Sequence, residues 1–82
     1  MTLLLLGTKG CHLCELAEEL IDECLEKGIK IHIERIDIAE QTEWQQDYAT
    51  LIPVLLQKET AQTLNWPFTK ADVLTFIEEQ YG

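Results

Sequence analysis

Basic residues are scarce in this sequence, with six Lys and Arg side chains against fifteen Asp and Glu, and the formal net charge is −9. A protein with this charge repels nucleic-acid backbones and anionic membrane surfaces. Long apolar runs are also missing. Leu3–Leu6 is shorter than the roughly 7 to 15 apolar residues of a signal peptide, and a membrane span needs roughly 20. We therefore expect neither nucleic acid nor a membrane as a partner, and we expect a monomer in the cytoplasm.

Internal repeats, low-complexity tracts and linkers are absent as well, and the four Gly and two Pro residues do not cluster. At 82 residues the chain has room for a single modest core. Its apolar content of 46% and charged content of 26% are ordinary for a globular protein and argue against intrinsic disorder. We expect one folded domain over residues 1–82.

Cysteine occurs only three times, at Cys11, Cys14 and Cys24. An odd number, with two cysteines separated by only two residues, does not match the disulfide framework of a small secreted protein. Zinc needs four ligands, and without a second closely spaced cysteine pair the remaining candidates are His12, Cys24 and His32. Redox chemistry at Cys11 and Cys14 is therefore the favoured interpretation, with metal binding as a weaker alternative.

The first half of the chain predicts a strand, a helix and a second strand. Leu3–Leu6, ended by Gly7, is typical of a strand buried on both faces. An amphipathic helix then opens at Cys11 and stops at Gly28, a residue suited to the left-handed conformation past a helix end. Residues 29–38 predict a strand whose isoleucines change from odd to even positions along it. The apolar face of the helix consists of Leu13, Leu16, Ala17, Leu20, Ile21, Cys24 and Leu25.

The middle of the chain predicts a second helix followed by a hairpin. Glu40–Tyr48 is compatible with a helix, and Trp44 and Tyr48 stand four residues apart, so both can face the core. Val54–Leu56 and Thr63–Asn65 are separated by a polar stretch that can turn the chain back, which predicts two antiparallel strands.

The last segment predicts a helix with a capping box. Thr69 followed by Asp72 has the required spacing, in which the Thr hydroxyl accepts from a free N–H of the first turn. The complete order is strand, helix, strand, helix, strand, strand, helix. Strands separated by helices pair in parallel through right-handed crossovers, so we expect an α/β fold with a four-stranded mixed sheet and three flanking helices. The buried stripe of the last helix consists of Val73, Leu74, Ile77 and Tyr81.

Cys11 and Cys14 lie one helical turn apart, so their Cα atoms fall inside the roughly 4.4 to 6.8 Å that a disulfide requires. The unpaired N–H groups and the dipole at a helix N-terminus favour a thiolate over a thiol. We therefore expect Cys11 to be the nucleophile, with a pKa below the value of about 8.5 of a free cysteine. Cys14, one turn deeper, suits the resolving thiol that displaces a mixed disulfide.

Charged neighbours of this cysteine pair act in both directions on the thiolate. Lys9 adds positive charge, and His12 adds more when it is protonated. Glu15 and Glu18, in the following turn, oppose both. The sign of their combined effect is therefore a hypothesis.

With the C-H-L-C segment of residues 11–14 between a buried strand and a helix, the chain resembles the thioredoxin superfamily, and within it the small glutaredoxin-like proteins. Leu51–Val54 looks like the segment that carries the cis proline of the superfamily, across from the cysteine pair. Residues 66–68, Trp-Pro-Phe, are typical of the glutaredoxin-like subgroup. The resemblance implies a thioredoxin-like fold in which the Ile52 backbone pairs with an extended substrate. The substrate contacts that we expect from it are Lys9, His12, Ile52 and Pro53.

The chain also departs from the glutaredoxin pattern in two places. Glutaredoxins carry a proline after the first cysteine, where this chain has His12. They also carry a Gly-Gly-x-Asp segment before the last helix that helps to seat glutathione, where residues 65–68 are Asn-Trp-Pro-Phe. The resemblance implies no bound cofactor and leaves the natural reductant open, with glutathione as one candidate.

The predicted function is dithiol–disulfide exchange on protein or small-thiol disulfides, in which Cys11 attacks and Cys14 resolves. A non-catalytic interaction module with the same fold is the main alternative, and a metal carrier using the same pair is the other. Outside the pair, we expect Cys24 to be a small buried core residue and His32 to lie on the surface.

Overall fold

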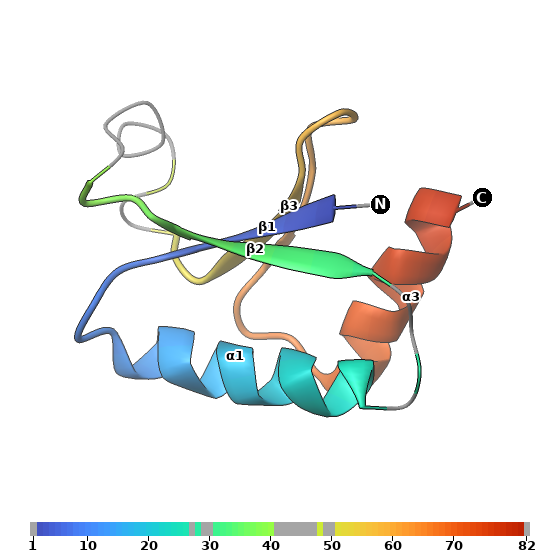
Figure 1. Cartoon of the computed structure of the whole chain (residues 1–82), viewed down its shortest axis with the longest axis horizontal. Coiled ribbons are helices and arrows are strands. Elements are labelled where there is room, and N and C mark those ends of the chain that lie inside the picture. Colours follow the sequence, from blue (N-terminus) through green and yellow to red (C-terminus); the bar gives the residue numbers. More distant parts are fainter. Residues whose placement is uncertain (1, 27, 29–30, 41–47, 49–50, 82) are drawn as a thin grey trace.

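The computed structural model describes residues 2–26, 28, 31–40, 48 and 51–81. These residues form one mixed sheet with the strand order β2-β1-β3-β4 and two helices (Figure 1). The predicted α/β fold with a four-stranded mixed sheet is confirmed. Neither helix in the described ranges has the length and apolar content that crossing a bilayer requires. The elements are β1 (Thr2–Gly7), α1 (His12–Leu25), β2 (His32–Asp37), β3 (Val54–Gln57), β4 (Gln62–Asn65) and α3 (Lys70–Tyr81).

β1 is buried on both faces, as its continuous leucine run predicts. It pairs in parallel with β2 along one edge and antiparallel with β3 along the other. Leu3 and Leu5 belong to the hydrophobic cluster on the face of the sheet that α1 and α3 cover, which we call the helical face. Leu4 and Leu6 belong to a second hydrophobic cluster on the opposite face. Full burial of a leucine side chain contributes about 1.5 to 3 kcal/mol, so this strand is a rigid base for the loop that follows it.

The isoleucines of β2 change from odd to even positions although the pairing of β2 with β1 is continuous. Its register with β1 runs unbroken from Thr2 opposite His32 to Gly7 opposite Asp37. Successive side chains of a strand point to opposite faces. Odd positions such as Ile33 therefore pack on the helical face, and even positions such as Ile36 pack on the other. Residues 29 and 30, where the strand was predicted to begin, lie outside the described residues.

β3 and β4 form the predicted hairpin, and each strand includes one residue more than the sequence pattern indicated. Leu55 pairs with Leu64 at its centre. All four residues of β3 are buried, whereas β4 is exposed apart from the half-buried Leu64. The turn between the strands contains Ala61 at φ 61°, in the left-handed region.

α1 and α3 pack together on the helical face of the sheet (Figure 1). An ion pair joins them at their ends, with Lys70 Nζ 2.6 Å from Glu23 Oε2. The hydrogen bond that Lys70 donates to that carboxylate raises the pKa of Lys70. The helical side chains buried in the shared cluster are Ala17, Ile21 and Cys24 from α1 and Val73, Phe76 and Ile77 from α3.

The opposite face of the sheet carries a second cluster. The helix predicted over Glu40–Tyr48 falls almost entirely outside the described residues, which contain two helices where the sequence predicts three. Trp44 lies outside them too. Tyr48 is described, and it is half-buried against the second cluster, as expected of a core-facing residue.

α1 ends as the glycine signal predicts, although the last helical residue comes slightly earlier. The helix stops at Leu25, with Glu26 as its C-cap. Gly28 has φ +89° and donates its N–H to the carbonyl of Leu25 at 3.1 Å. A glycine adopts this backbone without the steric cost that a Cβ would add.

The capping box of α3 is present in both directions. The Asp72 N–H donates to Thr69 Oγ1 at 3.1 Å, and the Thr69 N–H donates to Asp72 Oδ2 at 2.9 Å. Two N–H groups that would otherwise lack a partner are therefore satisfied by the same pair of residues. The shorter Asp side chain replaces the usual Glu without loss of the contact.

Thr69→Ala should remove one of these caps and lower the free energy of unfolding by about 1 kcal/mol. For a domain of this size that corresponds to a decrease of about 4 to 8 °C in Tm, which circular dichroism would measure. Thr75→Ala is the matched control, because Thr75 is an exposed residue of α3, and surface changes stay within about 0.5 kcal/mol. Equal losses in the two variants would contradict the capping role of Thr69.

Candidate active site

Cys11 and Cys14 form a disulfide bond, and their Cα atoms are 5.2 Å apart. The separation lies inside the range that the spacing of the two residues predicts. The short loop of residues 8–10 connects the end of β1 to this pair, and Gly10 takes φ +79° there, which favours glycine. The loop and the first turn of α1 together place both sulfurs at one end of the sheet.

The Cys11 sulfur caps α1. Helical geometry begins at His12 rather than at Cys11, which has the extended backbone of an N-cap residue at φ −86° and ψ 105°. The Cys14 N–H donates to Cys11 Sγ at 3.2 Å. When Cys11 is reduced, the same N–H and the positive end of the helix dipole stabilise negative charge on its sulfur.

The two cysteines differ in their access to solvent. Cys11 is half-buried, whereas Cys14 is only 7% exposed. A substrate disulfide must reach the attacking sulfur, but the resolving sulfur needs only to reach its partner within the protein. The exposures therefore agree with the order in which the sequence predicts the two thiols to act.

Gly7 allows Cys14 to pack against the end of β1. A Cβ at position 7 would lie 3.0 Å from Cys14 Sγ and 3.2 Å from Cys14 Cβ. The first distance is closer than ordinary van der Waals contact, so the second sulfur sits where only a glycine leaves room for it. The sequence marks this glycine as the end of a strand, and its closeness to sulfur follows from the packing of α1.

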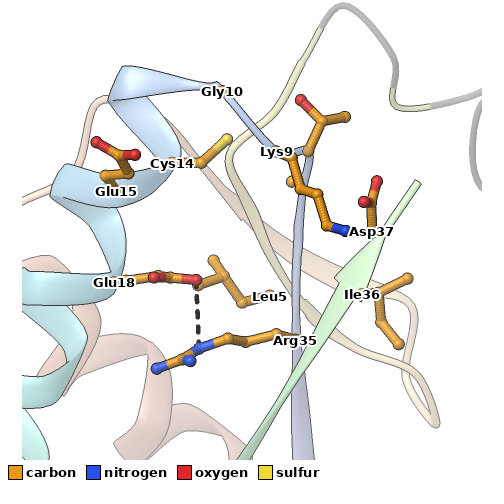
Figure 2. Close-up of a pocket in the computed structure, with 11 residues that line it drawn as sticks. Leu5, Lys9, Gly10, Cys14, Glu15, Glu18, Arg35, Ile36 and Asp37 are labelled. Atoms are coloured by element: carbon orange, nitrogen blue, oxygen red, sulfur yellow. Dashed lines mark ion pairs between the residues drawn. The ribbon is translucent and has the colours of Figure 1, made fainter. Parts of the chain in front are cut away.

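A cavity of about 430 Å³ lies between the start of α1, the loop after β1 and the end of β2 (Figure 2). We call it the Cys14 cavity, since Cys14 lines it and its sulfur points from α1 towards the loop. The other lining residues are Leu5, Gly7, Thr8, Lys9, Gly10, Glu15, Glu18, Arg35, Ile36 and Asp37.

Lys9 and His12, the predicted charged neighbours, are both exposed beside the pair. Figure 2 shows the Lys9 side chain extending across the mouth of the Cys14 cavity towards Asp37. His12 Nδ1 lies 3.8 Å from Glu15 Oε2, so a protonated His12 shares its charge with that carboxylate. The expectation that acidic residues of α1 oppose these cations therefore has a geometric basis.

The Ile52–Pro53 peptide bond is cis, as the resemblance implies. Pro53 is fully buried and precedes β3, and its carbonyl accepts the Trp66 N–H at 3.3 Å. In the antiparallel register Val54 stands opposite Leu6, so the next position outward places Pro53 opposite Gly7. The register therefore brings the proline segment to the end of β1 where Cys14 packs.

Cys24 and His32 have the surroundings that were predicted for them. Cys24 is 1% exposed within the core, and its thiol lies 3.9 Å from the Lys70 carbonyl. His32 is exposed at the start of β2. Within the part of the chain that the structure describes, no three His, Cys, Asp or Glu side chains are grouped to hold a metal ion.

Arg35 and Asp37 are the charged cavity residues that the sequence did not single out. Both belong to β2, and their distance from the cysteines along the chain gives no hint of their position. Only the parallel register, which sets Leu5 opposite Arg35 and Gly7 opposite Asp37, brings them beside the first helix.

Gly7→Ala should displace Cys14, because the added methyl group meets the sulfur and the Cβ of that residue. Overpacking of this kind costs about 1 to 3 kcal/mol of unfolding free energy, and we also expect slower closure of the Cys11–Cys14 disulfide from the dithiol. Urea unfolding and the rate of oxidation would measure the two effects. Gly28→Ala is the control, since it strains a positive-φ position without any atom near the added Cβ, and it should leave the closure rate unchanged.

The reduced protein should show a Cys11 thiol whose pKa is below that of an ordinary cysteine, because the Cys14 N–H and the helix terminus favour its thiolate. The rate of alkylation at Cys11, followed by mass against pH, measures this pKa. An inflection at or above about 8.5 would contradict the stabilisation.

Two solved structures resemble this chain over nearly its whole length. A Northeast Structural Genomics target protein from X. campestris, XcR50, is 23% identical, with a TM-score of 0.77 over 94% of this chain and 96% of that one. A structure described as that of a malarial protein is 17% identical, with a TM-score of 0.71 over 95% of this chain and 93% of the other. At these identities the likeness shows the fold.

The search of curated proteins gave no match. The family model described as Glutaredoxin-like domain (DUF836), however, matches residues 2–78. That range includes the disulfide, the cis-proline segment and every described strand and helix up to the last turns of α3. The chain belongs to the glutaredoxin-like domain family.

Proposed function

We propose that this protein is a dithiol–disulfide oxidoreductase in which Cys11 is the nucleophile and Cys14 is the resolving thiol. The observation that carries the proposal is the N-cap contact, in which the half-buried Cys11 sulfur accepts the Cys14 N–H at 3.2 Å. This arrangement combines an accessible sulfur, a stabilised negative charge and a second sulfur within bonding reach. Membership of the glutaredoxin-like family supports it.

The first step is attack of the Cys11 thiolate on one sulfur of a substrate disulfide. A bond forms between Cys11 Sγ and that sulfur, and the substrate disulfide breaks. The second substrate sulfur leaves as a thiolate and takes a proton from solvent. The product of this step is a mixed disulfide between Cys11 and half of the substrate.

The second step is displacement of the bound half by Cys14. The Cys14 thiol loses its proton, its sulfur attacks Cys11 Sγ, and the intramolecular disulfide forms as the mixed disulfide breaks. The remaining substrate half leaves as a thiolate and is protonated. Two electrons have then passed from the dithiol to the substrate, and an external thiol such as glutathione, or a reductase, returns them.

In this proposal the substrate binds between the cysteine pair and the cis-proline segment. Leu13 and Leu51 are each 45% exposed, and they stand next to His12 and Ile52 in the chain. Exposed large apolar side chains beside a reactive centre are suited to contact with a protein substrate. The Ile52 backbone would pair with an extended segment of that substrate, Pro53 would shape the segment, and Lys9 and His12 would contact it at the rim.

Cys11→Ser should abolish exchange, whereas Cys14→Ser should still complete the first step and accumulate a mixed disulfide with the substrate. Insulin reduction and intact-protein mass after incubation with hydroxyethyl disulfide would measure the two outcomes. Cys24→Ala is the matched control, and it should retain exchange because Cys24 lies in the core away from the disulfide.

Two results would refute the proposal. One is exchange that survives Cys11→Ser, and the other is a wild-type pair with no reversible dithiol–disulfide midpoint against dithiothreitol. The second result would favour the non-catalytic interaction module.

A further inference from the structure

Cys14 must ionise in the second step although it is only 7% exposed. Burial in apolar surroundings disfavours a thiolate, because a charge loses hydration there. The N-cap contact does not help this sulfur, since its acceptor is the Cys11 sulfur. The charges that surround Cys14 therefore decide how fast the mixed disulfide is resolved, an inference that rests on the proposed function.

The charges facing Cys14 come from three elements around its cavity. They are Lys9 in the loop after β1, Glu15 and Glu18 on α1, and Arg35 and Asp37 on β2. Of the described residues, Cys14 lines this cavity and Cys11 does not. The side chains of this cavity therefore lie beside the resolving sulfur.

Glu18 and Arg35 form an ion pair across the floor of this cavity, with Arg35 Nε 3.2 Å from Glu18 Oε1 (Figure 2). Glu18 lies one helical turn after Cys14, and residues at this spacing are neighbours on a helix surface. A second cavity of about 480 Å³ between α1 and β2 shares Leu5, Glu18 and Arg35 with the first. The ion pair thus lies where the two cavities meet.

We propose that the Glu18–Arg35 ion pair controls how readily the Cys14 thiol ionises. While the pair is intact, the two charges largely cancel at the sulfur. Loss of the carboxylate leaves the Arg35 cation uncompensated in the cavity that Cys14 lines, and favours the Cys14 thiolate. Loss of the cation leaves the Glu18 anion and disfavours the thiolate. Glu18 and Arg35 are therefore positioning residues that act through Cys14.

Two of the other charged groups of the cavity, Glu15 and Asp37, have partners of their own. Glu15 Oε2 lies 3.8 Å from His12 Nδ1, and the Glu15 side chain is 68% exposed. Asp37 accepts the Ala39 N–H on Oδ1 at 2.9 Å, and Lys9 extends towards it in Figure 2. Glu18 is better covered, with 37% of its side chain exposed, so water screens its charge less than that of Arg35, which is 63% exposed.

The test uses the full chain with Cys11→Ser, in which Cys14 is the single cysteine of the pair and the introduced hydroxyl can still cap the helix. Alkylation of Cys14 by iodoacetamide, followed by peptide mass against pH, gives its apparent pKa. Adding Glu18→Gln should lower that pKa by about half a unit, and adding Arg35→Gln should raise it by about as much. The double variant should return close to the parent.

A purely structural role would not shift the Cys14 pKa in opposite directions in the two single variants. If either variant merely loosened the site, both would shift this pKa in the same direction. Glu79→Gln is the matched control: it makes the same change of charge at an exposed residue near the end of α3, at the far side of the molecule from the start of α1 (Figure 1). Shifts of the same sign in both single variants, or an equal shift in Glu79→Gln, would overturn the proposal.

The midpoint potential of the chain with both cysteines intact provides a second measurement. A more acidic Cys14 thiol stabilises the reduced form, so Glu18→Gln should make the couple more oxidising and Arg35→Gln more reducing. The titration requires no turnover of a disulfide substrate. Opposite shifts without exchange activity would therefore refute only the proposed function, whereas exchange with an unmoved titration would refute only the role of the ion pair.

Discussion

The chemistry of this protein depends on one local contact, the hydrogen bond from the Cys14 N–H to the Cys11 sulfur. It is a helix cap made by a thiol side chain, and it does two things at once. It satisfies an N–H that the first turn of any helix leaves without a partner, and it places a donor and the helix dipole at the sulfur that reacts as an anion in the proposed exchange. Stability of the helix start and reactivity of Cys11 are therefore properties of the same atoms. The same turn brings the second sulfur within bonding reach.

This contact is held in place by the sheet behind it. β1 is buried on both faces, and its last residue, Gly7, lies against the Cys14 sulfur and accepts the Ile38 N–H on its carbonyl at 2.9 Å. The buried Pro53 continues the antiparallel register at the same end of the strand. Three segments that are far apart in the chain thus meet at one strand end. A shift of any of them changes the surroundings of Cys14 more than those of the half-buried Cys11, because Cys14 is the packed sulfur.

The two sulfurs consequently have different electrostatic environments. A backbone N–H of α1 contacts the Cys11 sulfur, and Cys14 lines a cavity bordered by side chains from α1, β2 and the connecting loop. Backbone dipoles change little when a single residue is replaced, whereas side-chain charges change with every substitution at positions such as Glu18 or Arg35. If the proposed exchange holds, the nucleophile stays constant while the rate of resolution and the potential vary with a few residues that line the cavity.

The amino-acid sequence by itself determined the cysteine pair, the leucine strand, the capping box and the hairpin, because each depends on residues within about one helical turn or one β-turn of each other. The family pattern also located the cis Ile52–Pro53 bond. The tertiary structure alone decided that Gly7 makes room for a sulfur and that Arg35 reaches Glu18, since both facts require the packing of α1 onto the sheet and the register of β2. The isoleucine pattern of β2 shows the same limit. It is explained only by the assembled sheet, in which Ile33 packs against the cluster on one face and Ile36 belongs to the cluster on the other.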